Sequence, residues 1–309
     1  MRLLQSVAIV LSLIPIALRI RAWRCDAVYT NTICTCVGAI AARILRIPHV
    51  WHIHEFGFED HGLGFYFGER FSVRAMERLS CLCIANSHAV ARKFSKYISP
   101  SKLTVVYQSV TFANGDLTEP SRTLFAEESP GLVCIMVGTL HERKGHAEAI
   151  RAIAEVRNEC GAHLLIVGSG DARYVRSLRR LIRDCELEDR VRFVGYDENP
   201  ARLVAGADLL LVCSRAEAFG RVTVEAMMLG KPVIGAKSGG TVELIQDGTN
   251  GFLYTPGDYK ELGERILFLE RHPDRRRAMG DTARIWAAQR FTKRRYGEAL
   301  LRELVARNI

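Results

Sequence analysis

The sequence predicts an α/β protein with two domains, each built on a parallel β-sheet covered by helices. Short apolar runs alternate with longer segments of helical periodicity over most of the 309 residues, which is the pattern of stacked βαβ units. The alternation stops once, at 111–130, where Pro, Gly, Asn, Ser and acidic residues follow no period, and then it starts again. The chain is 48% hydrophobic, which suffices for two cores and excludes a disordered tail.

The chain begins with an apolar segment, Leu3 to Leu18, which ends at a cluster of three arginines (Arg19, Arg21 and Arg24). It is shorter than the ~20 apolar residues that span a bilayer as a helix. A charged start and an apolar middle are typical of a signal peptide, but no small-residue cleavage site follows. Three interpretations stay open: a buried or interfacial helix, which we favour, a signal anchor and a cleaved signal. The arginines are suited to anionic headgroups.

The first domain, residues 1–110, is expected to contain four strands with helices between them. Asn86 or Ser87 is a good N-cap residue, so a helix is expected to start there and to continue to Tyr97. Another helix is expected over Cys36–Arg46. The four strands are predicted at Ala27–Asn31, His49–Ile53, Cys81–Ala85 and Leu103–Tyr107.

The second domain, residues 131–290, follows the predicted linker at 111–130 and is expected to contain six strands. A loop rich in Gly, Ser or acidic residues follows each strand, and ligands of parallel sheets bind at such carboxyl ends. From Tyr259 to the end the pattern is helical, with breaks at His272–Pro273 and near Phe291–Thr292. The strands are predicted at Leu132–Val137, His163–Val167, Arg192–Val194, Asp208–Val212, Pro232–Gly235 and Phe252–Tyr254.

The net charge of +9 comes mostly from arginine, because only eight of the 43 basic residues are lysines. Residues 1–110 carry 13 basic and 6 acidic side chains, a surplus of +7. Arginine binds phosphate and carboxylate groups well, so an anionic surface or substrate is expected. Nucleic acid is disfavoured because the arginines are not interleaved with aromatic residues in any known reading motif.

Nine cysteines, an odd number, include two C-x-C pairs, Cys34 with Cys36 and Cys81 with Cys83. Both pairs are expected on strands, where a spacing of two directs both side chains to one face. Neither pair has the spacing or the matching partners of a zinc site. We therefore expect free thiols in a reducing cytosol.

The loop after the first strand of the second domain begins at Gly138 and carries Arg143 and Lys144 just before a helix. Two cations beside free N–H groups at the positive end of a helix dipole make a phosphate site in physical terms. A solvated basic turn is the alternative. The next loop, Gly168-Ser-Gly170, is only half of a dinucleotide fingerprint, so it is weak evidence for a nicotinamide cofactor and equally fits a tight turn.

The most informative segment follows the fourth strand of this domain. Glu217 lies in the loop, Gly220 begins a helix and Glu225 lies one to two turns inside it. A carboxylate accepts two hydrogen bonds side by side, which matches a vicinal diol of a sugar or ribose. The N–H groups near Phe219 and Gly220 can bind the anionic part of the same ligand. The Ser238-Gly239-Gly240-Thr241 loop after the next strand also allows close backbone approach.

In the first domain, His54 and an acid follow the strand that ends at Ile53. His52 and His54 point to the same side of the strand, so a metal pair is conceivable. No third ligand has diagnostic spacing and no D-x-D sequence occurs, so a polar or catalytic histidine is favoured and no metal is expected.

Together these motifs resemble the retaining, nucleotide-sugar-dependent glycosyltransferases of family 4, glycosyl transferases group 1. Glu217 and Glu225 form the E-x₇-E motif in EAFGRVTVEAMMLGKPVIG. VGTLHERKG, IVGSG, VRFVGY, SGGTVELI and NGFLYTPGD occur in the order expected of the family. The match is dense over 131–290 and looser over 26–110. The resemblance implies a GT-B fold, two Rossmann-like domains facing across a cleft, with a C-terminal helix (291–309) that crosses back to the first domain.

The resemblance also implies roles in donor binding. Lys144, with Arg143, would hold the diphosphate of a nucleotide-diphospho-sugar. Glu225 would bind the ribose hydroxyls, and the backbone at Gly195 and Tyr196 would lie by the base. Gly138 and Gly168 belong to the same donor-binding loops.

For the transferred sugar, the resemblance implies that Glu217 binds it together with the backbone at Phe219 and Gly220. His54 would face the sugar across the cleft, so His54, Glu217 and Lys144 are the predicted catalytic residues. The reaction would retain anomeric configuration, and the leaving diphosphate would accept the proton of the acceptor. Cations and helix termini stabilise charge on that diphosphate, so neither a metal nor a cofactor is expected.

The chain departs from the family pattern at three places. Thr139 stands where an arginine is common, and Gln108-Ser109 replace an asparagine–glycine turn. The first strand and glycine-rich loop of the family are also absent, so the N-terminal domain is expected to lack its first βα units, roughly 60–90 residues. A start further upstream, a partner chain that supplies the missing part, and a remnant all stay open.

The predicted function is transfer of a sugar from a nucleotide-diphospho-sugar to a lipid-linked or polysaccharide acceptor. The predicted location is the cytoplasm, peripheral on the inner face of the cytoplasmic membrane. The alternative is a non-catalytic nucleotide-sugar-binding remnant, or one subunit of a split glycosyltransferase. An in-frame upstream segment encoding a strand and glycine-rich loop would remove the reason for this alternative.

Overall fold

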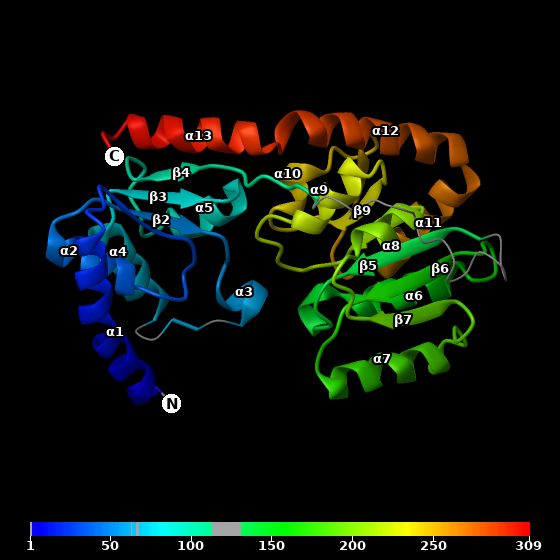
Figure 1. Ribbon diagram of the computed structural model, residues 1–309. Helices are drawn as coiled ribbons and strands as arrows, with labels where there is room; N and C mark the ends of the chain where they lie inside the picture. Colours follow the sequence, from blue (N-terminus) through cyan, green and yellow to red (C-terminus); the bar gives the residue numbers. More distant parts are fainter. Residues whose placement is uncertain (1, 63, 66–67, 113–130) are drawn as a thin grey trace. The chain divides into compact units, whose positions relative to one another are not determined.

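The computed structural model describes residues 2–62, 64–65, 68–112 and 131–309. The chain divides into two compact units, one of Met1–Ser109 with Arg294–Ile309 and one of Val110–Lys293. Each unit has a wholly parallel sheet with helices against it (Figure 1). The α/β class predicted from the alternating pattern is therefore confirmed. Most of the predicted linker, 113–130, lies outside the described residues.

The first unit has four strands in the order β1-β2-β3-β4. They lie at the four predicted positions, with ends that differ by up to two residues. Strand β2 has all five side chains buried, as expected of a parallel strand covered on both faces. The strands are β1 (Val28–Thr30), β2 (His49–Ile53), β3 (Leu82–Ala85) and β4 (Leu103–Val105).

Helices join these strands. The Ser87 hydroxyl accepts a hydrogen bond of 3.1 Å from the Val90 N–H, so Ser87 is the N-cap of α5. The N-cap of α2 is Cys36, and neither Cys34 nor Cys36 lies on a strand. The expectation that this C-x-C pair shares a strand face was wrong, because the chain turns toward α2 there. The helices are α1 (Arg2–Ala22), α2 (Val37–Leu45), α3 (Phe58–His61), α4 (Glu69–Leu79) and α5 (His88–Phe94).

The last helix, α13 (Lys293–Val305), packs on the sheet of the first unit. Val50 of β2 and Leu82 and Ile84 of β3 are buried beneath a row of its side chains. That row recurs at helical spacing, which places it on one face of the helix. The row and its C-terminal continuation comprise Tyr296, Ala299, Leu300, Leu304 and Ile309.

Helix α1 packs against α2 in the first unit, and Ile20 near its end is buried. Leu11, Ile14 and Leu18, at spacings of three and four residues, are 62–69% exposed. Within the part of the chain that the structure describes, no helix has the length and apolarity needed to span a membrane.

The second unit has six strands in the order β10-β9-β8-β5-β6-β7, and all six lie where the sequence predicted them. The order reverses between β5 and β8, so the carboxyl ends of these two strands flank a crevice. The strands are β5 (Val133–Val137), β6 (His163–Val167), β7 (Val191–Gly195), β8 (Leu209–Val212), β9 (Val233–Ala236) and β10 (Gly251–Tyr254).

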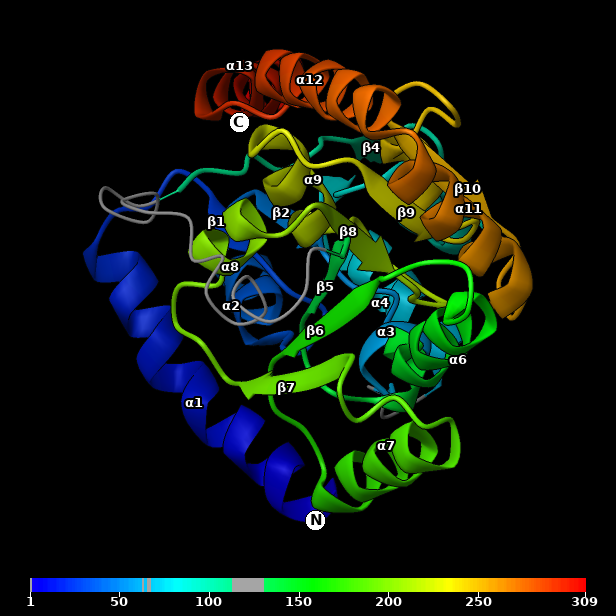
Figure 2. The same cartoon turned by 90° about the vertical axis from the view of Figure 1, so that its right-hand side faces the viewer.

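Helices α6, α7 and α11 cover one face of this sheet, where their apolar side chains join a core cluster with side chains of β5, β6, β8 and β9. Figure 2 shows α6 and α7 on one side of β5–β7 and α8 on the other. The helical tail breaks where expected, at His272 before α12 and between Phe291 and Thr292. The helices are α6 (His146–Val156), α7 (Ala172–Asp184), α8 (Ala201–Gly206), α9 (Arg221–Met228), α10 (Thr241–Leu244), α11 (Tyr259–Arg271) and α12 (Pro273–Arg290).

Candidate functional site

The loop after β5 brings Lys144 to the carboxyl edge of the second sheet. Lys144 ends a short 3₁₀ helix, Glu142–Lys144, and Gly145 then adopts a left-handed conformation with φ of 72° before α6 begins. A Cβ at Gly145 would lie 2.3 Å from the Cys213 carbonyl oxygen, so only glycine permits this close approach of the two loops. The Arg215 N–H donates to the Arg143 carbonyl (3.1 Å) and joins the loop to the one after β8.

The loop after β8 carries Glu217 and is held by the loop after β9. The Gly240 N–H donates to the Glu217 carbonyl at 2.6 Å, and the Ser238 hydroxyl donates to the Ser214 carbonyl at 2.7 Å. A Cβ at Gly239, where φ is 52°, would lie 2.3 Å from the Glu217 carbonyl oxygen. The close backbone approach predicted for the glycine pair is confirmed, and its effect is to fix the Glu217 backbone.

Lys144 and Glu217 meet at this edge. The Lys144 ammonium donates to the Glu217 carboxylate over 2.9 Å, with side chains 29% and 16% exposed. Both line a cavity of about 20 Å³ at the carboxyl ends of β5 and β8, together with Gly138, His146 and Ser214. That volume holds about one water molecule, so a larger ligand would contact the pair from above the cavity.

His146 is a residue of this cavity that the sequence analysis did not single out. It is 2% exposed, and burial lowers its pKa to about 4, so the imidazole is neutral at pH 7. Its Nδ1 atom has no hydrogen-bond partner among the described residues. In the sequence, His146 was marked only by its position directly after Lys144 and Gly145. Spacing alone does not distinguish a histidine of a functional site from a histidine of the core.

Glu225 takes a different position from the other predicted acid. It lies in α9, and its carboxylate is paired with the Arg221 guanidinium one turn earlier, at 3.0 Å. Its side chain is 24% exposed and does not line the small cavity. Gly220, with φ of 96°, is the N-cap of α9, and the Phe219 side chain is buried.

Three predicted glycines lie side by side on adjacent strand ends. The Gly138 N–H donates to the Val167 carbonyl (3.0 Å), and the Gly168 N–H donates to the Gly195 carbonyl (2.7 Å). A Cβ at Gly168 would lie 1.9 Å from the Gly138 carbonyl oxygen. Tyr196, which follows Gly195, is 74% exposed.

His54 belongs to the first unit, directly after β2. Its Nε2 atom is hydrogen-bonded to the Asn31 side-chain oxygen at 2.6 Å, and its carbonyl accepts from the Asn86 side chain at 2.9 Å. The His52 and His54 rings lie 4.0 Å apart, as expected of side chains on one side of a strand. Burial lowers the pKa of His54. The contacts that Asn31 and Asn86 make with His54 were not predicted, because asparagine after a strand is also common in turns.

The residues that the structure describes include no group of three or more His, Cys, Asp and Glu side chains placed to hold a metal ion.

Two parallel α/β units, with Lys144, Glu217 and aligned glycines at the strand ends of the second, define a GT-B protein. The glycosyl transferases group 1 model matches residues 121–286, and the Glycosyltransferase Family 4 model matches residues 5–112. The chain belongs to the glycosyl transferases group 1 family.

Relatives and solved structures agree with this assignment. The N-acetyl-alpha-D-glucosaminyl L-malate synthase of Bacillus anthracis is 31% identical over 211 residues, 67% of this chain and 55% of that protein. The GDP-mannose-dependent alpha-(1-6)-phosphatidylinositol monomannoside mannosyltransferase of Mycobacterium tuberculosis is 32% identical over 174 residues, 53% of this chain and 44% of that protein. The chain spans about half the length of these curated relatives.

The structure of Anabaena HepE in complex with UDP superposes with a TM-score of 0.84 at 30% identity, over 95% of this chain and 82% of that one. The complex of the same protein with UDP-glucose gives a TM-score of 0.81 at 31% identity, over 95% and 82%.

Proposed function

We propose that this protein transfers a sugar from a nucleotide-diphospho-sugar to a lipid-linked or polysaccharide acceptor, with retention of anomeric configuration. The observation that carries the proposal is the Lys144–Glu217 pair, 2.9 Å apart at the strand edge where ligands of such sheets bind. The HepE complexes with UDP and UDP-glucose support a nucleotide-sugar donor.

Each polar group has a role in this proposal. The Lys144 ammonium has three donors, of which Glu217 uses one, and the others are available to phosphate oxygens. Arg143 adds a second cation beside it. Glu217 would bind sugar hydroxyls with its remaining acceptor sites, and Glu225 would bind the ribose.

In the proposed reaction, the bond between the anomeric carbon and the diphosphate oxygen breaks as a bond to the acceptor oxygen forms on the same face. The acceptor proton passes to the leaving diphosphate, so charges and atoms balance. Lys144 stabilises the negative charge that develops on this phosphate. His54 would contact the transferred sugar.

The test is incubation of the purified chain with UDP-glucose, with UDP-N-acetylglucosamine and with GDP-mannose. At least one should raise the melting temperature and be consumed when acceptor lipid or glycan is supplied, and proton NMR of the product should show the donor's anomeric configuration. A rise in melting temperature without turnover would support the alternative, a nucleotide-sugar-binding remnant or a split enzyme. An unchanged melting temperature with all three donors would contradict both.

Peripheral contact with an anionic membrane is part of this proposal. Arg19, Arg21 and Arg24 lie at the end of α1, where the exposed Trp23 ring is 5.5 Å from the Arg19 guanidinium. Aromatic and basic side chains together suit a lipid headgroup layer. Sedimentation with phosphatidylglycerol vesicles but not with phosphatidylcholine vesicles is expected, and equal recovery with both would contradict it.

A further inference from the structure

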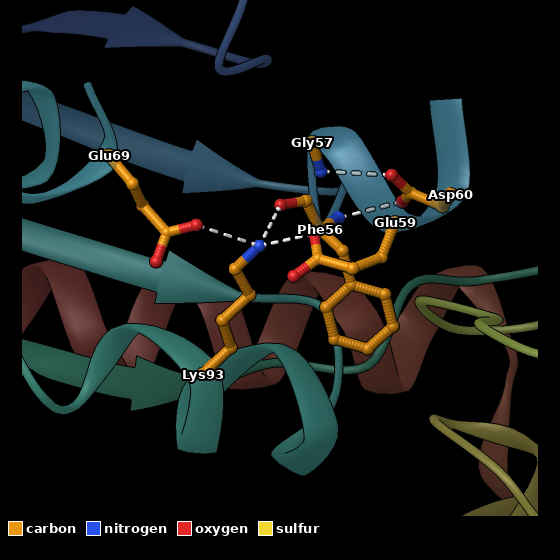
Figure 3. A network of polar contacts seen from close by, with 6 residues as sticks. All are labelled: Phe56, Gly57, Glu59, Asp60, Glu69 and Lys93. Carbon is orange, nitrogen blue, oxygen red and sulfur yellow. Dashed lines mark hydrogen bonds and ion pairs between the residues drawn. The ribbon is translucent and has the colours of Figure 1, made fainter. Parts of the chain in front are cut away.

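Lys93 in α5 makes a set of contacts that the proposed reaction does not use (Figure 3). Its ammonium donates to the Phe56 carbonyl oxygen at 2.6 Å and to the Glu59 carboxylate at 2.5 Å. The Glu69 carboxylate lies 3.1 Å away. The Lys93 side chain is only 13% exposed, although a lysine at a surface ordinarily extends into water.

These three acceptors come from three different segments of the first unit. Phe56 lies in the loop after β2, Glu59 is in α3, and Glu69 is the first residue of α4. The ammonium donates hydrogen bonds to the first two groups and forms an ion pair with the third. Lys93 therefore joins α5 to the loop after β2, to α3 and to α4 through a single nitrogen atom.

A second side chain holds the same loop from the other side. The Asp60 carboxylate accepts hydrogen bonds from the Phe56 N–H at 2.7 Å and from the Gly57 N–H at 2.9 Å. The peptide group before Phe56 is thus held by Asp60, and the peptide group after it is held by both Asp60, through the Gly57 N–H, and Lys93, through the Phe56 carbonyl (Figure 3). Gly57 has φ of 96° and ψ of −97°, a mirror-image β conformation that glycine adopts without the steric cost a side chain would add.

The fixed peptide lies two residues after His54. We propose that Lys93 is a positioning residue, which holds the loop after β2 through the Phe56 carbonyl and so keeps the His54 imidazole in place. The inference rests on the proposed function only for the role of His54 in catalysis. Phe56 is 8% exposed, so loss of the lysine would leave a nearly buried carbonyl without its donor.

The positioning role of Lys93 can be tested without substrate, because the surroundings of the His54 imidazole affect its pKa. The His54 imidazole faces the His52 ring and the Asn31 amide, and the Glu55 carboxylate accepts a hydrogen bond from the His54 backbone N–H at 3.3 Å. Its pKa is lowered by burial. If the loop loosens, the imidazole becomes more hydrated and its pKa rises toward the ordinary 6.5.

The experiment compares Lys93→Met with Lys96→Met, in which an exposed lysine just after α5, without an ion pair among the described residues, loses the same charge. Histidine ring NMR signals are followed from pH 4 to 8, and His54→Gln identifies the His54 signal. The His54 midpoint should rise toward the ordinary histidine value in Lys93→Met and be unchanged in Lys96→Met.

Two carboxylates without a counterion could also raise this midpoint. The triple variant Lys93→Met/Glu59→Gln/Glu69→Gln removes both charges, and its midpoint should stay raised if position is the cause. The proposal would be overturned if the His54 midpoint of folded Lys93→Met equalled that of the wild type. It would also be overturned if the midpoint returned to the wild-type value in the triple variant. Should Lys93→Met not fold, Lys93→Arg serves instead, because its planar fork cannot reproduce three contacts from one nitrogen.

A kinetic measurement adds the catalytic consequence. With any donor that the wild-type chain consumes, Lys93→Met should lower kcat about tenfold with little change in the donor KM, while Lys96→Met keeps both. Because the NMR titration needs neither donor nor acceptor, it tests the positioning role even where the chain transfers no sugar.

Discussion

The Lys144 ammonium lies 2.9 Å from the Glu217 carboxylate, although 73 residues separate the two in the chain. The contact exists because β5 and β8 are neighbours in the sheet and their following loops approach through Gly145 and Cys213. The Gly240 N–H then fixes the backbone of Glu217. A cation and a carboxylate are thereby held at one strand edge by backbone contacts from three loops.

Gly239→Ala should displace Glu217. The new Cβ would lie 2.3 Å from the Glu217 carbonyl oxygen at a residue with φ of 52°, so we expect a loss of about 2–4 kcal/mol of stability. Gly248→Ala is the matched control, because φ is 75° but no atom lies within 4 Å of the added Cβ. It should cost about 1 kcal/mol. Urea unfolding measures both, and equal losses would contradict the role of Gly239.

Lys144→Met should abolish donor binding with little change in stability. The ion pair with Glu217 is partly exposed, so its loss should change the unfolding free energy by less than about 1 kcal/mol. Loss of a phosphate-binding cation should lower turnover about 100-fold or more. The control is Lys237→Met, an exposed lysine in the loop after β9. Calorimetry with UDP-glucose measures binding, and wild-type affinity in Lys144→Met would rule out a phosphate contact.

Glu225→Gln should remove the rise in melting temperature that a nucleotide sugar produces. Its carboxylate is held by Arg221 at 3.0 Å, and its proposed role is to accept the ribose hydroxyls. An amide can accept only one side of a vicinal diol pair, so about 1–3 kcal/mol of binding is expected to be lost. Glu264→Gln, at an exposed position of α11, should bind as the wild type does. If a nucleotide sugar raised the melting temperature of Glu225→Gln as much as that of the wild type, Glu225 would not bind the ribose.

The stability of both units should fall below pH 6.5. Burial lowers the pKa of His49 in the first unit and of His146 in the second to about 4. Between pH 6.5 and 4 the unfolded chain therefore binds protons that the folded chain does not, and stability decreases as the pH falls. Each histidine contributes up to about 3 kcal/mol to this loss. Urea titrations at pH 7.5, 6 and 5 measure it, and equal midpoints would contradict the neutral buried state.

Much of the fold was predictable, because a parallel strand that is buried on both faces appears in the sequence as a short continuous run of apolar residues. Strand β6, His163–Val167, was predicted to the residue, since a continuous apolar run has clear ends. The predicted strand Leu103–Tyr107 extended past Val105, because β-branched and aromatic residues also occur after a strand ends. The break between α11 and α12 followed directly from Pro273, which cannot continue a helix.

The site was predicted less completely. The loop residues Lys144 and Glu217 belong to recognisable sequence motifs, and their contact follows from the order of the strands. Lys93 and Asn31 belong to no such motif. A lysine in a helix and an asparagine after a strand are ordinary surface residues until their partners are known. Glu225 was predicted within the E-x₇-E motif, but its pairing with Arg221 depends on side-chain rotamers.

By itself the sequence determined the parallel α/β class, the ten strands found among the described residues, and the loops that carry the acid and lysine motifs, since periodicity and glycine placement act within a few residues. Tertiary structure alone decided which of these loops touch. The Lys144–Glu217 pair and the Lys93 contacts join residues 73 and 24 to 37 positions apart in the chain. Such contacts depend on strand order and helix packing, which local composition does not encode.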